Sequence, residues 1–216
     1  MDAILRQAEK VLELIAKSGR PGEWVQNHLI GSGALSDLLA VDDLAGMNRD
    51  GRRLFLGLSM LNLPLLEEIG TVTIPATTKP FVAREKFVVN LGEGAPVKIS
   101  FLGGNFQDWF LGKTENSMEA IMLRYAKLTK PSPDSPILTE LGEKAKTTLS
   151  QIYALMAGQP NGEEGVLLTN GWANIFYVDG RAVRVNWYGH GWLVHAYLVT
   201  DPGRWHDEYR VFSRNS

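Results

Sequence analysis

Apolar and polar residues alternate most regularly between residues 165 and 212, and this alternation predicts an antiparallel sheet. Asp179-Gly180 separates two runs rich in β-branched and aromatic residues, which predicts a two-residue type I′ turn. A second two-residue turn at Gly189-His190 would place Arg184 directly opposite His195. The sequence therefore predicts three adjacent strands with a defined register.

These turns distribute the side chains of the strands between two faces, because successive residues point to opposite sides. The apolar face is predicted to be core and carries Trp172, Asn174, Phe176, Val183, Val185, Trp187, Trp192, Val194 and Ala196. The mixed face carries Ala173, Ile175, Tyr177, Ala182, Arg184, Asn186, Leu193, His195 and Tyr197. A three-residue loop at the second turn would exchange the faces of one strand relative to its neighbour.

The first 70 residues follow the helical period instead. Apolar residues recur every three or four positions in segments 2–17 and 49–61, which predicts a mostly helical N-terminal part. Near Gly70 the period changes toward two, and strands are predicted over residues 71–75, 81–91 and 97–102. Asn105 is predicted to cap a short helix that continues to Leu111.

The segment from 115 to 141 admits two interpretations. A helix from Met118 through Arg124 with an extended continuation is favoured, and the alternative is a strand over 122–128 that pairs with 137–141. Residues 143–157 carry a clear apolar stripe and predict a helix that covers one face of the sheet. A last strand is predicted within 207–212.

Helices come first in this pattern, and strands and helices then follow in blocks. Such an order indicates an α+β fold with a helical N-terminal part beside an antiparallel sheet with a packed helix, and not an alternating α/β fold. We expect a helical subdomain over residues 1–70 and a sheet domain over residues 71–216, joined in one compact unit.

Composition narrows the classes of function. The chain has 216 residues, 44% of them hydrophobic, which is enough for a full core. Its net charge of −2 argues against a dedicated nucleic-acid binder. Cysteine is absent, which excludes disulfides, thiolate catalysis and cysteine-ligated metals. No signal-peptide pattern and no apolar run of membrane-spanning length is present, so we expect a cytoplasmic protein with no membrane partner.

The mixed face offers the best candidate binding site: Tyr177, Arg184, Asn186, His195 and Tyr197. An arginine presents a planar fork to a carboxylate or phosphate, and its charge is expected to lower the pKa of a neighbouring histidine. This chemistry suits a polar or anionic ligand. The competing interpretation is a solvated face, or one covered by the 143–157 helix with an ion pair to Arg184.

A second cluster, His206, Asp207 and Glu208, has the residue types for acid–base work. A three-ligand metal site that adds His190 and His195 is conceivable, but no spacing is diagnostic, and no metal or cofactor is expected. Trp205 is predicted to be the best exposed tryptophan, whereas the tryptophans of the strands are predicted to be core.

These observations favour a soluble, non-enzymatic binding or interaction protein whose partner is a small polar ligand or another protein. The alternative is a hydrolase that uses His195 or His206 with a nearby carboxylate, with or without a metal ion. The sequence leaves open whether the protein is an enzyme.

Several stretches resemble a family of small bacterial proteins that is uncharacterised and has no known function. They are Arg84–Asn90, Pro96–Phe106, Asn161–Gly165, Asn174–Tyr177 and Val211–Ser216. The resemblance covers roughly residues 80–216 and leaves out the helical N-terminus. It implies no activity, cofactor or catalytic residue.

Overall fold

The computed structural model describes residues 64–215 together with residues 17, 19, 23 and 27. The predicted N-terminal helices fall on residues outside this set. The chain divides into two units, Met1–Asn62 and Leu63–Ser216, and the strands of the structure lie in the second unit. Its first strand begins at Leu66, ahead of the boundary predicted at residue 70.

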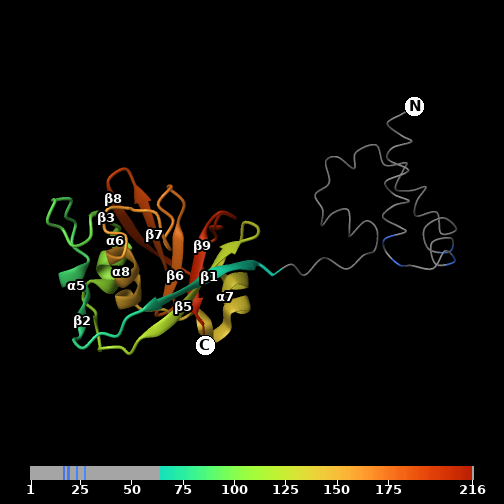
Figure 1. Ribbon diagram of the computed structural model, residues 1–216, viewed down its shortest axis with the longest axis horizontal. Helices are drawn as coiled ribbons and strands as arrows, with labels where there is room; N and C mark the ends of the chain where they lie inside the picture. The colour runs from blue at the N-terminus through green and yellow to red at the C-terminus, as the bar shows by residue number, and fades with distance from the viewer. Residues whose placement is uncertain (1–16, 18, 20–22, 24–26, 28–63, 216) are drawn as a thin grey trace. The chain divides into compact units, whose positions relative to one another are not determined.

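Strands and helices both contribute to this unit, which is an α+β structure (Figure 1). The strands are β1 (Leu66–Ile74), β2 (Phe81–Val82), β3 (Ile99–Leu102), β4 (Thr114–Glu115), β5 (Ile121–Leu128), β6 (Asn174–Val178), β7 (Arg181–Tyr188), β8 (Gly191–Leu198) and β9 (Arg210–Arg214). The helices are α5 (Ala83–Lys86), α6 (Gly104–Phe110), α7 (Asp134–Leu141), α8 (Leu149–Ala157) and the 3-10 helix η2 (Gly142–Ala145). None of the helices in the described part of the chain is long and apolar enough to cross a membrane.

Seven strands form one sheet in the order β1-β5-β9-β6-β7-β8-β3, and β2 and β4 form a separate pair. The sheet is mixed: β9 runs parallel to β6, and β3 runs parallel to β8. The remaining neighbours are antiparallel. The predicted last strand is confirmed as β9, although it lies inside the sheet between β5 and β6.

Both predicted turns are confirmed. Val178 pairs with Arg181 across Asp179 and Gly180, whose φ angles of 48° and 73° are positive as a type I′ turn requires. Tyr188 pairs with Gly191 across a two-residue turn in which Gly189 has a φ of 66°. The strand faces therefore follow the predicted alternation.

The sheet has a hydrophobic core on each side. Phe176, Val185 and Trp192 pack on one side against α8 and α6, which confirms the predicted apolar face. Ile175 and Ala182 pack on the other side against α7 and η2. Figure 1 shows α6 and α8 on one side of the sheet and α7 on the other.

Trp172 does not join the apolar face as predicted. It precedes β6 and is 37% exposed, and its ring centroid lies 5.0 Å from that of His206. The ladder between β6 and β7 ends at the pair Asn174 and Val185, so the predicted contact of Trp172 with Trp187 is not made. Trp187 instead packs edge-on against Trp192, with ring centroids 5.3 Å apart.

The helix favoured for Met118 through Arg124 is wrong, because these residues lead into the strand β5. This strand runs between β1 and β9, and it places Leu123 in one core and Ala126 in the other. Apolar residues on both faces obscure the period of two that identifies a strand. The alternative interpretation had the strand right but its partner wrong, since 137–141 belongs to α7.

Two other predicted elements are divided in the structure. The strand predicted over 81–91 is interrupted by the helical turn α5, which brings the rings of Phe81 and Phe87 to a centroid distance of 6.1 Å. An extended strand would hold these residues about 20 Å apart. The helix predicted over 143–157 is broken at Thr147, whose N–H donates to the carbonyl of Tyr177. Of its two parts, α8 covers the apolar face and η2 packs on the opposite side of the sheet.

The predicted helix after Asn105 is present as α6, but Asn105 does not cap it. The N-cap is Gly103, and the side chain of Asn105 donates to the carbonyl oxygen of Ala196 at 3.3 Å. The amide of Asn105 therefore ties α6 to β8.

Candidate functional site

Arg184 and His195 are direct partners on β7 and β8, as the two turns predicted. The pKa of His195 lies below its usual value, first because the ring is partly buried and second because the charge of Arg184 is close. The imidazole also packs against two aromatic rings, with centroid distances of 5.3 Å to Phe101 and 6.2 Å to Tyr197. A neutral His195 is therefore held in an aromatic setting beside a permanent cation.

The guanidinium group of Arg184 lies over an aromatic ring and has no acceptor among the described residues. Its central carbon is 5.6 Å from the ring centroid of Tyr197. Its Nε atom is buried without a hydrogen-bond partner, and no ion pair joins Arg184 to any carboxylate of the described residues. The ion pair to the 143–157 helix that would have accounted for this arginine is not formed.

Tyr177 is removed from the predicted binding surface. It is only 3% exposed, because α7 and η2 cover this end of the mixed face. Its hydroxyl donates to Oδ1 of Asp134 at 2.7 Å, and burial together with this carboxylate raises the pKa of the tyrosine far above its usual value. Tyr177 therefore stabilises the fold beneath the surface.

A small cleft opens on the mixed face beside Arg184. Its volume is about 130 Å³, and its walls include Asp134, Arg184, Tyr197, Asp201, Arg204 and Trp205. Two of the five predicted ligand-binding residues, Arg184 and Tyr197, thus line it. Asn186 does not line it, and its Oδ1 atom is buried without a hydrogen-bond partner in the described part of the chain.

The carboxylates of the cleft are already bonded to protein donors. Oδ1 of Asp134 accepts hydrogen bonds from the Tyr177 hydroxyl and from Nε1 of Trp205, both at 2.7 Å. Burial is the main reason that the pKa of Asp134 is raised, and the nearby charge of Asp201 adds to it. Oδ2 of Asp201 accepts from the backbone N–H of Leu198 at 3.2 Å.

Trp205 is therefore not the exposed tryptophan that the sequence predicted. Its indole is partly buried because its N–H is directed at Asp134, and its ring packs edge-on against Tyr197 at a centroid distance of 5.7 Å. The loop that carries it is held by backbone hydrogen bonds between Trp205 and Ser132. This loop contributes one wall of the cleft.

The predicted acid–base cluster is divided between two interactions. Nδ1 of His206 lies 2.7 Å from Oδ1 of Asp207, and the two side chains are 57% and 42% exposed. Glu208 instead pairs with Lys127 at 3.0 Å. In the part of the chain that the structure describes, no three histidine or carboxylate side chains gather as a metal site requires, so the hypothetical site of His190, His195 and His206 is not assembled there.

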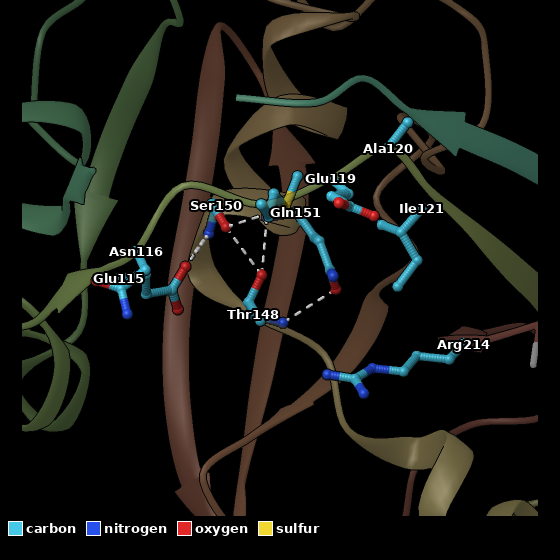
Figure 2. A pocket seen from close by; sticks show the side chains of 10 residues that line it. Glu115, Asn116, Glu119, Ala120, Ile121, Thr148, Ser150, Gln151 and Arg214 are labelled. Carbon is cyan, nitrogen blue, oxygen red and sulfur yellow. Dashed lines mark hydrogen bonds between the residues drawn. The ribbon is translucent and has the colours of Figure 1, made fainter. Parts of the chain in front are cut away.

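A larger pocket, which the sequence analysis missed, lies on the opposite face of the sheet (Figure 2). Its volume is about 440 Å³, and its walls come from segment 115–121, the start of α8 and Arg214 of β9. These segments are far apart in the sequence. The one readable signal was Thr148-x-x-Gln151, a capping-box spacing that marks the start of α8.

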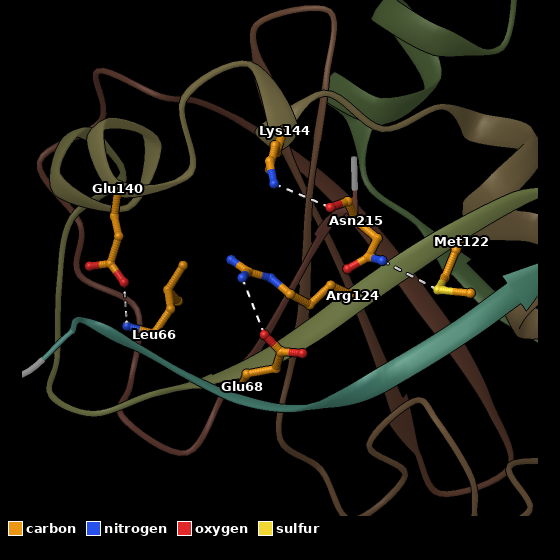
Figure 3. A network of polar contacts seen from close by, with 7 residues as sticks. All are labelled: Leu66, Glu68, Met122, Arg124, Glu140, Lys144 and Asn215. Atoms are coloured by element: carbon orange, nitrogen blue, oxygen red, sulfur yellow. Dashed lines mark hydrogen bonds and ion pairs between the residues drawn. The ribbon is translucent and has the colours of Figure 1, made fainter.

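A polar network on the α7 side of the sheet holds β1 and β5 in place (Figure 3). The carboxylate of Glu140 accepts from the backbone N–H groups of Leu65 and Leu66, at 2.7 and 3.0 Å. Arg124 pairs with Glu68 at 3.3 Å. The Glu140 carboxylate thus holds the start of β1 to α7. Arg124 keeps its ion pair to Glu68, but its Nε atom is buried without a hydrogen-bond partner among the described residues.

Comparison with protein-family models, with curated proteins and with solved structures found no match.

Proposed function

We propose that the protein is a binding protein for a small anionic ligand, held in the cleft between Arg184 and Arg204. The proposal rests on a difference between the acidic and the basic side chains of the cleft. Both carboxylates of the cleft accept hydrogen bonds from protein donors, whereas neither arginine has an acceptor among the described residues. An oxyanion supplied by a ligand would satisfy these donors.

The chemistry of the cleft suits a carboxylate or a phosphate. A guanidinium presents two parallel N–H groups to such an anion, and charge-assisted hydrogen bonds are the stronger kind. Tyr197 supports Arg184 from one side, since its ring lies beneath the guanidinium. The volume of about 130 Å³ is well below the range of about 300–1,000 Å³ typical of whole-ligand pockets. We infer that the cleft takes one anionic group, and that the remainder of the ligand stays outside.

A hydrolase is the second candidate, and a single contact favours it. His206 and Asp207 are bonded in the manner of a general base and the group that orients it. This pair lines neither pocket, so a substrate would have to bind on the open surface. Substrate screening with His206→Ala tests this candidate, because activity that survives the substitution excludes His206 as the base.

The binding proposal is tested by thermal-shift titration of the full chain with phosphate and with malonate at constant ionic strength. A ligand at a hundredfold excess over its dissociation constant stabilises the fold by about 2.7 kcal/mol. We expect Arg184→Gln and Arg204→Gln each to remove most of the shift. Arg181→Gln is the matched control, because Arg181 is on the same strand as Arg184 but lies over the ring of Trp109 instead. An equal shift in all three variants would refute the proposal.

A further inference from the structure

The pocket of about 440 Å³ at the start of α8 is independent of the Arg184 cleft. Its size falls within the range of about 300–1,000 Å³ that small-molecule sites occupy. Polar atoms reach it from α8 and β9, and apolar side chains reach it from the segment before β5. The groups of this pocket that lack a protein partner indicate the chemistry of its ligand.

The backbone N–H groups at the N-terminus of helix α8 are not available to bind a ligand. Glu115 accepts hydrogen bonds from the backbone N–H groups of Leu149 and Ser150, both at 2.8 Å. Thr148 and Gln151 cap each other's backbone N–H groups. The N–H groups at the start of a helix can attract an anion, but here they donate to the protein's own side chains.

Arg214 is the cation that remains. It is partly buried on β9, its Nε atom has no hydrogen-bond partner, and it makes no ion pair with a carboxylate of the described residues. Figure 2 shows its side chain reaching from β9 toward Thr148 and Gln151. Burial of the Nε–H group of a guanidinium without an acceptor is unfavourable, and a ligand oxygen would supply that acceptor.

Glu119 supplies the opposite charge on another wall of the same pocket. Its side chain is exposed and forms no ion pair with Arg214 or with any other cation of the described residues. In the view of Figure 2 the amide of Gln151 lies between Glu119 and Arg214. Met118 and Ile121 add an apolar surface to the pocket. A cation and an anion thus line one cavity without neutralising each other.

We propose that this pocket binds a small zwitterion, an α-amino acid with an apolar side chain. Its carboxylate pairs with the guanidinium of Arg214, and its ammonium group pairs with Glu119. Its side chain packs against Met118 and Ile121. Each charged group of the pocket that lacks a protein partner is then matched by a ligand group of opposite sign.

The test is calorimetric titration of the full chain with leucine, with phenylalanine, and with two truncated analogues of leucine. 4-Methylpentanoate lacks the ammonium group, and 3-methylbutylamine lacks the carboxylate. We expect saturable binding of at least one amino acid. If that amino acid is leucine, each analogue binds about tenfold more weakly, in line with the loss of one charge-assisted contact. If it is phenylalanine, the corresponding analogues are 3-phenylpropanoate and 2-phenylethylamine.

Two variants assign the contacts. Arg214→Gln should weaken amino-acid binding about tenfold or more. Glu119→Gln should reduce amino-acid binding to the level of the carboxylate analogue and leave the analogue's own affinity unchanged. Glu119 is exposed, so this variant stays informative even if Arg214→Gln impairs folding. Arg204→Gln is the control, because Arg204 lines only the other cleft.

The proposal is overturned if neither amino acid gives saturable heat at millimolar concentrations. It is also overturned if binding is detected but Glu119→Gln and a folded Arg214→Gln leave it unchanged. Loss of binding in Arg204→Gln would reassign the amino acid to the Arg184 cleft and would likewise refute the proposal.

Discussion

Arg184 lies directly opposite His195 on adjacent antiparallel strands, so a permanent cation stands beside a partly buried imidazole. This pair is the centre of the mixed face, and its geometry depends on the two-residue turn at Gly189 and His190.

The pKa of His195 should rise when Arg184 is replaced by glutamine, because the repulsion between the two cationic groups is removed. It should remain below the usual value of about 6.5, since burial is the larger cause of the shift. Proton NMR titration of the imidazole resonances, assigned with His195→Gln, measures both. An unchanged pKa in Arg184→Gln would show that the two groups are not coupled.

The lowered pKa of His195 also makes stability depend on pH. The unfolded state takes up a proton at about pH 6.5, and the folded state takes it up only at lower pH. His195 therefore costs stability as pH falls through 6.5 toward the folded pKa, and costs nothing well above 6.5. Urea unfolding between pH 5 and pH 8 should show a shallower decline for His195→Gln than for the parent protein. Parallel curves would contradict this expectation.

Asp134 should tolerate asparagine better than alanine. Folding raises its pKa, so the ionised carboxyl opposes folding at neutral pH, and this penalty disappears below the unfolded pKa of about 3.9. Asp134→Asn keeps the acceptor for Tyr177 and Trp205 without the charge, and we expect equal or greater stability at pH 7. Asp134→Ala leaves both donors without a partner and should cost about 1–3 kcal/mol. Chemical unfolding of the two variants compares them directly, and equal losses would exclude the hydrogen-bonding role.

Gly189 should not accept a β-branched residue. Its φ of 66° lies in the left-handed region, which costs other residues about 1–2 kcal/mol. Gly189→Val should lower the free energy of unfolding by at least this amount. Gly112→Ala is the control, because Gly112 has no positive φ and a Cβ atom there would contact nothing within 4 Å. Equal effects in urea unfolding would mean that the turn does not require glycine.

Glu115 should contribute to stability, whereas the nearby Glu119 should not. Glu115→Ala removes both acceptors from the first N–H groups of α8, and we expect a loss of about 1–3 kcal/mol. Thr148→Ala removes the cap of the same helix and should cost about 0.5–2 kcal/mol. Glu119→Gln is the matched control, since Glu119 is exposed and makes no hydrogen bond within the described chain. A similar loss in Glu119→Gln would point to general charge effects.

The turns and the strands that they connect could be predicted from the sequence, because each depends on residues that are close together in the chain. Two turns with residues suited to positive φ were enough for the register of β6, β7 and β8, and hence for the pairing of Arg184 with His195. The position of β9 between β5 and β6 could not be predicted from the sequence, because the residues of a strand do not indicate which strands pair with it. The strand β5 was predicted as a helix for another reason: its apolar residues lie on both faces of the sheet and resemble a helical stripe in the sequence.

In the candidate sites too, contacts within one hairpin could be predicted, whereas contacts between distant segments could not. Arg184 and Tyr197 were found because one hairpin brings them together. Tyr177 was placed on the correct face, but only the packing of α7 buries it. The larger pocket joins Glu119, Gln151 and Arg214, which no spacing relates.

The location of β9 has a consequence for how the protein is made. β1 and β5 form one hydrogen-bonded block, β6, β7, β8 and β3 form another, and β9 is the strand that joins them. Among the strands of this sheet in the described residues it comes last in the chain, so the two blocks are synthesised before the strand that connects them. Until then β5 and β6 each present an unpaired edge, which is the surface on which strands from other chains can add. The growing chain therefore depends on β9 to protect both edges from aggregation.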